Sequence, residues 1–329
     1  MRTTIKEYLW LLALAALTAL IVIPANADDM KVWRHGIVEA KSDAGIVFMA
    51  SKGGFAEKRG LKIEIEQFKG DTLALKALLA GELDSYEGNP GSPMIAASRG
   101  ADIKLIGCYW PGLTYAIYSK PNINSVAELK GKTLAISAPG ALPDLVVRAV
   151  LAEKNLSAAD VKFAIMGSDA DRFKALTAGV VDAAAASSGF APAAQNAGLK
   201  LLVHAVEAVP NYVRFCIYSN AKTLAARKED AANFLAAEMA GFRHALANRD
   251  QTIELTREIT HAKPDNPLPA FTYDEVKRYS AVDPDMPIPM NKLVWLRDLL
   301  VKTGNLTQPV DLDKFVDADI RAKALQIGK

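Results

Sequence analysis

The stretch Asp71-Thr-Leu-Ala-Leu-Lys-Ala-Leu-Leu-Ala-Gly-Glu-Leu-Asp84 recurs 98 residues later, without a gap, as Asp169-Ala-Asp-Arg-Phe-Lys-Ala-Leu-Thr-Ala-Gly-Val-Val-Asp182. The same register continues further, so that ten of thirty positions are identical when 71–100 is aligned with 169–198. Composition alone would give about two or three such identities. The chain therefore contains an internal duplication, which predicts two similar structural units.

Each copy predicts a helix that ends at a glycine and leads into a short strand. We expect Asp71 and Asp169 to cap the helices, because a carboxylate accepts hydrogen bonds from the unpaired first N–H groups of a helix. Gly81 and Gly179 are expected to end the helices, since glycine adopts the left-handed conformation without a steric cost. Strands over 83–86 and 181–185 and turns of small residues follow.

The same order of elements precedes each copy. Opening strands are predicted over 31–37 and 133–136, and second strands over 61–67 and 161–166, with a loop and a helix between them. Strands that alternate with helices predict two parallel α/β lobes. A ligand of such a sheet binds beyond the carboxyl ends of the strands, so two facing edges would form a cleft.

Two apolar, strand-like runs bracket the second copy and predict the connections between the lobes. If Thr114–Ser119 and Val213–Ser219 both cross, the second lobe covers 119–213. The first lobe then combines 28–118 with the chain over 214–329, and the two crossings form a hinge. The C-terminal part predicts short helices separated by prolines, which we expect to pack on the first lobe and to contribute little to a site. These helices are predicted over 227–247, 250–260, 273–281 and 291–303.

The N-terminus has the pattern of a cleaved signal peptide over 1–27. Arg2 and Lys6 precede an apolar run, Leu9–Ile23, and Ala25-Asn26-Ala27 offers small residues at a cleavage point. The run of about 15 residues is short for a membrane span of about 20. The sequence therefore predicts export to the periplasm.

Composition and motifs exclude several classes of function. The formal net charge is only +2 and no basic cluster is present, which argues against nucleic acid or an anionic membrane as the partner. The hydrolase motif G-x-S-x-G, the metalloprotease motif H-E-x-x-H and the dinucleotide motif G-x-G-x-x-G are missing. We therefore expect no catalytic residues, no metal and no cofactor, and a monomer that is not an enzyme. Whether Cys108 and Cys216 pair stays open.

The candidate binding residues lie on loops at the expected cleft edges. Asn89 and Ser187 occupy matching positions of the two copies, where short polar side chains suit hydrogen bonds to a ligand or ordinary turns. Ser188 follows Ser187 directly. The loop after the first strand contributes Glu39 and Ser42.

Five more candidate residues could bind the ligand or could have a purely structural role. Ser137 and Gly140 precede a helix predicted from about residue 143, whose N-terminus favours an anion unless Asp144 in its first turn only caps it. Trp110 follows a strand and either stacks on a ligand or packs in the core. Arg214 stands among apolar residues and needs a partner, which is either a protein carboxylate or a ligand acceptor.

Several segments resemble the solute-binding proteins of ABC transporters, above all the branch that binds sulfonates, taurine and thiamine-pyrimidine precursors. The segments are 125–137, the turn Pro139-Gly140, and the runs 174–182 and 211–219. The resemblance implies an α/β, two-lobed periplasmic-binding-protein type II fold with a two-strand hinge. It also implies a small-molecule ligand, and a permease and an ATPase as partners.

The resemblance leaves two rival functions open. An enzyme branch of the same family synthesises a pyrimidine in the cytoplasm and carries a Cys-rich motif, which this chain lacks. A sensory protein that binds a solute and reports to a receptor is the other alternative.

Charge on the expected cleft loops predicts the kind of ligand. Glu39, Asp43 and Asp144 face Lys41 and Arg214, three acids against two bases. This count favours a neutral or partly cationic planar ligand, such as a pyrimidine or another nitrogen heterocycle, with Trp110 as its stacking face. Arg214 alone could reverse the preference towards a sulfonate, since its guanidinium offers a fork of donors.

Overall fold

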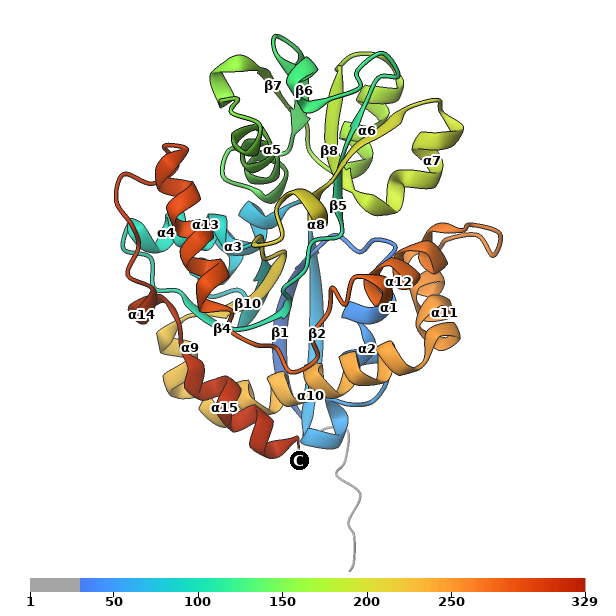
Figure 1. Ribbon diagram of the computed structural model, residues 1–329. Coiled ribbons are helices and arrows are strands. Elements are labelled where there is room, and N and C mark those ends of the chain that lie inside the picture. Colours follow the sequence, from blue (N-terminus) through green and yellow to red (C-terminus); the bar gives the residue numbers. More distant parts are fainter. Residues whose placement is uncertain (1–29, 329) are drawn as a thin grey trace, which may run out of the picture. The chain divides into compact units, whose positions relative to one another are not determined.

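The computed structural model describes residues 30–328 of the chain (Figure 1). The expected signal peptide over 1–27 lies outside these described residues. From Lys31 onward the chain forms one compact unit, which contains two five-stranded sheets. In the part of the chain that the structure describes, every helix is too short or too polar to cross a membrane.

The two sheets have matching strand orders, which follows from the duplication. The first has the order β2-β1-β3-β10-β4 and the second the order β7-β6-β8-β5-β9. The strands of the first sheet are β1 (Lys31–Val38), β2 (Leu61–Phe68), β3 (Ser85–Gly88), β4 (Lys104–Trp110) and β10 (Phe215–Ser219). Those of the second are β5 (Tyr115–Ser119), β6 (Thr133–Ile136), β7 (Lys162–Ile165), β8 (Ala183–Ser187) and β9 (Lys200–His204).

Each sheet contains one strand that runs antiparallel to its neighbours, a direction that the prediction of parallel α/β lobes did not include. β10 is antiparallel to β3 and β4, and β5 is antiparallel to β8 and β9. Both are the strands that enter from the other lobe, and they therefore return in the opposite direction. The remaining pairs, β1 with β2 and β3 and β6 with β7 and β8, are parallel.

The crossings between the lobes are short segments that lie before the two returning strands. β5 pairs only inside the second sheet and β10 only inside the first. The chain therefore crosses at 111–114 and again at 209–214. All of β5 pairs in the second sheet, whereas the expected boundary between residues 118 and 119 fell inside this strand. Lys292 holds the two crossings together, because its Nζ donates to the carbonyl oxygens of Pro111 and Pro210, at 2.9 Å each.

A disulfide joins the first-sheet ends of both crossings. Cys108 on β4 and Cys216 on β10 are bonded to each other, which answers the question that the sequence left open. The residues between them comprise both crossings and the entire second lobe.

The duplicated helices begin one residue earlier than the capping prediction requires. α3 (Asp71–Ala80) has Gly70 as its N-cap, and α6 (Asp169–Thr177) has Ser168, which forms a capping box with Asp171. The prediction that Asp71 and Asp169 are caps is therefore wrong, because both occupy the first helical position. Gly81 and Gly179 do take the left-handed conformation, with φ of 79° and 75°.

The other helices cover the faces of the two sheets (Figure 1). α10 (Lys228–Ala247) packs on the first sheet, where Phe234 stacks on Trp33 with ring centroids 5.2 Å apart. The other long helices are α5 (Leu142–Glu153), α11 (Arg249–Thr260), α12 (Leu268–Arg278), α13 (Met290–Lys302) and α15 (Ala318–Ile327). Shorter ones are α1 (Ala44–Val47), α2 (Met49–Lys52), α4 (Gly91–Ser98), α7 (Ala191–Asn196), α8 (Ala205–Ala208), α9 (Ala221–Ala226) and α14 (Leu312–Phe315).

One C-terminal helix contacts the second lobe in addition to the first lobe, on which these helices were expected to pack. Glu275 of α12 is buried. It accepts a hydrogen bond from the Ser188 hydroxyl, and its Oε1 lies 2.8 Å from Nε2 of His204. α12 therefore bridges the two lobes beside the crossings.

Candidate functional site

A cavity of about 220 Å³ lies between the lobes at the carboxyl ends of the strands. This is far more than the 10–15 Å³ or so that one water requires. The first lobe supplies the loop after β1, the start of α3, Asn89 and the start of β10. The second lobe supplies Tyr115, the loop after β6 and the starts of α5 and α6. The residues that line it are Val38, Glu39, Lys41, Lys69, Gly70, Asp71, Thr72, Leu73, Asn89, Tyr115, Ser137, Ala138, Ala141, Leu142, Pro143, Gly167, Ser168, Asp169, Arg172, Arg214 and Phe215.

The second-lobe wall holds an aspartate that is fully paired. Asp169 accepts hydrogen bonds from Lys41 Nζ at 2.8 Å, from the Tyr115 hydroxyl at 2.8 Å and from the Arg172 guanidinium. Burial alone would raise the pKa of Asp169, but Lys41 and Arg172 outweigh it and hold this pKa well below its usual range. Since Lys41 belongs to the first lobe, this ion pair also spans the cavity.

The matching aspartate on the first-lobe wall forms no ion pair with any of the described residues. Asn89 Nδ2 donates to Asp71 Oδ2 at 3.3 Å, while Oδ1 is buried and has no hydrogen-bond partner among the described residues. Burial raises the pKa of Asp71 to about 7. A Cβ at Gly88 would lie 2.0 Å from Oδ1, so only glycine fits there. The duplication thus places on opposite walls one acid with a lowered pKa and one acid whose pKa is raised to about 7.

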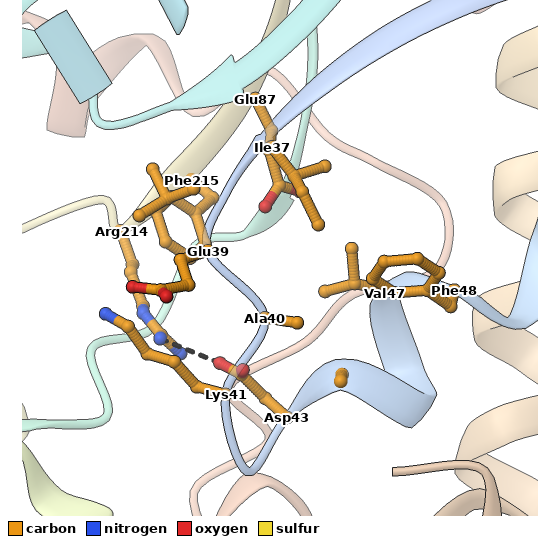
Figure 2. A pocket seen from close by; sticks show the side chains of 12 residues that line it. Ile37, Glu39, Ala40, Lys41, Asp43, Val47, Phe48, Glu87, Arg214 and Phe215 are labelled. Carbon is orange, nitrogen blue, oxygen red and sulfur yellow. Dashed lines mark hydrogen bonds and ion pairs between the residues drawn. The ribbon is translucent and has the colours of Figure 1, made fainter. Parts of the chain in front are cut away.

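A smaller cavity of about 20 Å³ adjoins the large one and has room for about one water-sized group (Figure 2). The two cavities share Val38, Glu39, Lys41, Arg214 and Phe215 as lining residues. Arg214 Nη2 donates to Asp43 Oδ2 at 2.8 Å on one side of this cavity.

A buried glutamate points into the small cavity from β3. Glu87 accepts a hydrogen bond from the Tyr109 hydroxyl, and burial raises the pKa of Glu87 to about 8. Sequence reasoning missed Glu87, Asp71 and Asp169, although the repeat itself places both aspartates on the cleft edges.

Four of the predicted site residues line the large cavity: Glu39, Asn89, Ser137 and Arg214. Their contact with a ligand stays a prediction. Of the two partners proposed for Arg214, the structure has the protein carboxylate, Asp43. Arg214 Nη1 also donates to Thr114 Oγ1, at 2.8 Å.

Trp110 and Asp144 lie outside both cavities, contrary to the roles that favoured a planar ligand. Trp110 is fully buried, and the Arg214 guanidinium lies 4.2 Å from its ring centre and covers it. Asp144 is also fully buried, because it accepts the Gly140 N–H at 2.7 Å and pairs with Arg148 Nε at 2.7 Å. Phe215 and Tyr115, instead of Trp110, are the aromatic residues of the cavity wall.

The remaining predicted residues are engaged in packing between segments and do not line the large cavity. Ser187 Oγ accepts the N–H of Gly189, and Ser188 donates to Glu275. Ser42 accepts a hydrogen bond from Thr272 Oγ1 at 2.8 Å. Gly140 has a left-handed φ of 77° and shapes the loop before α5.

Comparison with known proteins gives both family and structural matches. A family model described as NMT1/THI5 like matches residues 41–252. A binding protein of Brucella abortus (strain 2308) is 30% identical over 151 residues, which are 45% of this chain and only 46% of that relative.

Two solved structures are similar along nearly the whole chain. The alkanesulfonate-binding protein SsuA from Xanthomonas axonopodis pv. citri, bound to MOPS, has a TM-score of 0.73 at 20% identity and covers 88% of this chain and 99% of its own. The desulfurization enzyme DSZB has a TM-score of 0.65 at 14% identity and covers 91% of this chain and 100% of its own. The likeness to SsuA confirms the expected two-lobed fold.

Proposed function

The chain belongs to the NMT1/THI5-like family, and from this we propose that it is a periplasmic solute-binding protein that delivers a small organic molecule to an ABC importer. The observation that carries the proposal is the cavity of about 220 Å³, which both lobes line at the ends of two short crossings. Similarity to a binding protein from Brucella abortus supports the same function.

Closure of the lobes is the expected mechanism. A solute first contacts one wall, and the second wall then excludes water and completes the hydrogen bonds. A permease and its ATPase would recognise the closed form, and the signal peptide expected over 1–27 would deliver the protein to the periplasm.

The ligand that the first-lobe wall favours carries hydrogen-bond donors. Asp71 has a free buried acceptor atom beside the cavity, and Asn89 lies next to it. Phe215 and Tyr115 offer aromatic surface to a planar group. A pyrimidine or another nitrogen heterocycle with an amino group matches this wall.

A sulfonate is the second candidate, supported by the opposite wall. Lys41 and Arg172 bring two cations to one acid, Asp169. The starts of α5 and α6 face the same space, and helix N-termini favour anions. The SsuA structure of similar fold is an alkanesulfonate-binding protein.

Native mass spectrometry of freshly purified protein, followed by calorimetry with an aminopyrimidine and an alkanesulfonate, tests the proposal. We expect one solute class to bind without being changed, and Asn89→Ala to weaken it. Conversion of the solute into a product would instead support an enzyme, as DSZB shares the fold. Genes for a receptor kinase next to this gene, in place of a permease and an ATPase, would support the sensory alternative.

A further inference from the structure

The carboxylic acid of Glu87 forms one wall of the small cavity beside the proposed solute site. Figure 2 shows the Glu87 carboxylate directed into the space bounded by Ile37, Val47 and Phe215. Glu87 is 3% exposed, and the only hydrogen bond that it makes among the described residues comes from the Tyr109 hydroxyl. One of its carboxylate oxygens therefore remains available to a group in the cavity.

Among the described residues, Glu87 forms no ion pair, although two cations line the same cavity. Arg214 is paired with Asp43 at 2.8 Å, and Lys41 is paired with Asp169 at 2.8 Å on the far side of the large cavity. Glu39, the remaining charged residue of the lining, is an exposed acid. Both cations therefore form their ion pairs with other carboxylates, and neither forms one with Glu87.

The size and position of the cavity restrict what the partner can be. About 20 Å³ admits one group of the size of a water molecule, and an ammonium group has that size. Five shared lining residues connect it with the large cavity. By the duplication, Glu87 on β3 corresponds to Ala185 on β8, so the acid is specific to the first lobe.

We propose that the small cavity is a subsite for a protonated amine, whose ammonium group binds Glu87 while the rest of the solute fills the large cavity. The proposal rests on the proposed function and narrows it to solutes that carry an amino group. The subsite is compatible with a heterocycle that carries an amino group and with an amino-sulfonate. The first-lobe wall of the large cavity favours the heterocycle, and the second-lobe wall favours the sulfonate.

Proton release accompanies binding at this subsite. Burial raises the pKa of Glu87 to about 8, so at neutral pH the empty site holds mostly the protonated acid. The ammonium ion displaces that proton, and Glu87 becomes the carboxylate that the ammonium group contacts. Affinity for an amine should therefore rise between pH 6 and pH 8. The titratable and charged groups nearby are Tyr109, Asp43, Arg214, Lys41, Glu39 and, from α10, Glu238.

The test compares matched solutes with and without the amino group. Calorimetry measures taurine against ethanesulfonate, and 5-aminomethyl-2-methylpyrimidine against 2,5-dimethylpyrimidine. We expect the amine of at least one pair to bind about ten- to a hundredfold tighter, as for a charge-assisted hydrogen bond. Glu87→Gln should abolish that difference. Glu238→Gln is the matched control, because Glu238 is equally buried but lines neither cavity.

A second measurement works without a variant and without the full solute. Carboxyl ¹³C NMR of the unaltered protein with methylammonium chloride should shift the Glu87 signal and lower its pKa. The subsite is overturned if the amine and its matched solute bind equally in both pairs, or if the difference in affinity survives in Glu87→Gln. The proposed transport function would still stand in either case, provided that a solute binds. If methylammonium does not bind and the Glu87 signal stays unchanged, the subsite is overturned as well.

Discussion

At the scale of single residues, the repeat places the same acid in two opposite electrostatic settings. Asp169 accepts hydrogen bonds from two cations and a tyrosine, whereas Asp71 accepts one from the neutral amide of Asn89. The difference comes from neighbours outside the repeated helix, since Lys41 reaches Asp169 from the other lobe. One wall is therefore a fixed anion, and the charge of the other depends on pH and on the ligand.

Replacement of Asp71 should change how the stability of the empty protein depends on pH. Its folded pKa of about 7 lies above the ordinary value of 3.8, so the neutral acid stabilises the fold. That contribution is complete below about pH 4 and is lost as the pH rises through 7. The melting temperature should therefore fall less between pH 5 and pH 8 in Asp71→Asn than in the unaltered protein.

The control for this experiment is Asp250→Asn, which alters an exposed carboxylate. It should leave the pH profile as it is. Identical profiles for Asp71→Asn and the unaltered protein would show that Asp71 is charged in the folded state throughout this range.

Asn89 and Ser187, matched in the repeat, should differ in their effect on binding. Asn89 lines the cavity, and Ser187 does not. Loss of a neutral hydrogen bond typically costs about 0.5–1.5 kcal/mol, so Asn89→Ala should weaken solute binding roughly two- to tenfold. Ser187→Ala should leave the affinity measured by calorimetry unchanged. A larger loss from Ser187→Ala than from Asn89→Ala would mean that the solute lies nearer to β8 than the cavity does.

The sequence predicted the loops of the site better than the side chains. Glu39, Asn89, Ser137 and Arg214 lie at the cavity because loops at strand ends must lie there. Trp110 does not, since the direction of a side chain at a strand end depends on local twist, and Arg214 covers its ring. Phe215, the residue after Arg214, was not predicted because it lies within an apolar run of the sequence.

At the scale of elements, the two crossings are joined by the hydrogen bond from Arg214 to Thr114 and by a lysine from another part of the chain. Lys292 of α13 donates to the carbonyls of Pro111 and Pro210, and burial lowers its pKa. Prolines in the crossings restrict the backbone, and Lys292 joins one crossing to the other.

Lys292→Met should destabilise the protein and loosen both crossings. Two carbonyls lose their donor, at a cost of about 1–3 kcal/mol in the free energy of unfolding. Hydrogen exchange should accelerate at 111–114 and 209–214, with less change in α10. Lys302→Met, at an exposed position on the same helix, should alter neither quantity. Equal exchange rates in the two variants would contradict a role for Lys292 at the crossings.

Periodicity and turn residues were sufficient to predict most helices and strands, but not their directions or first residues. β6 was predicted over its full length, Thr133–Ile136. The antiparallel direction of β5 and β10 was not foreseen, because strand direction depends on where the chain returns. Ser168 caps α6 in place of Asp169, since the capping box with Asp171 satisfies two backbone groups at once.

At the scale of the whole molecule, direct contacts between side chains join the two lobes. Lys41 pairs with Asp169 across the cavity, and Glu275 of α12 contacts Ser188 and His204 of the second lobe. Any opening of the lobes must break or stretch these contacts, so they favour the closed arrangement.

Lys41→Met should shift the empty protein towards an open form. Small-angle scattering should then give a larger radius of gyration for the empty variant, and addition of the solute identified by mass spectrometry should reduce it. Lys62→Met removes an exposed pair with Glu64 inside the first lobe and serves as the control. A radius that is the same for all three empty proteins, and unchanged by solute, would argue against hinge closure.

The two-lobed fold was predictable because the repeat doubles every signal, and an alternation of strands and helices has few solutions. The boundary between lobes was less so. The sequence of a strand such as β5 is compatible with either sheet. Only the pairing of the strand shows to which lobe it belongs.

The disulfide between β4 and β10 makes the second lobe part of a covalent ring. Cys108 and Cys216 close it, and both arms of the ring leave the first sheet at one point. Cutting the backbone anywhere within the second lobe would leave the two fragments tethered. Exchanging the whole lobe for that of a relative would leave this anchorage in place. The second lobe could therefore be exchanged as one unit on the disulfide-bonded first sheet. Such an exchange would alter the part of the cavity wall that the second lobe supplies.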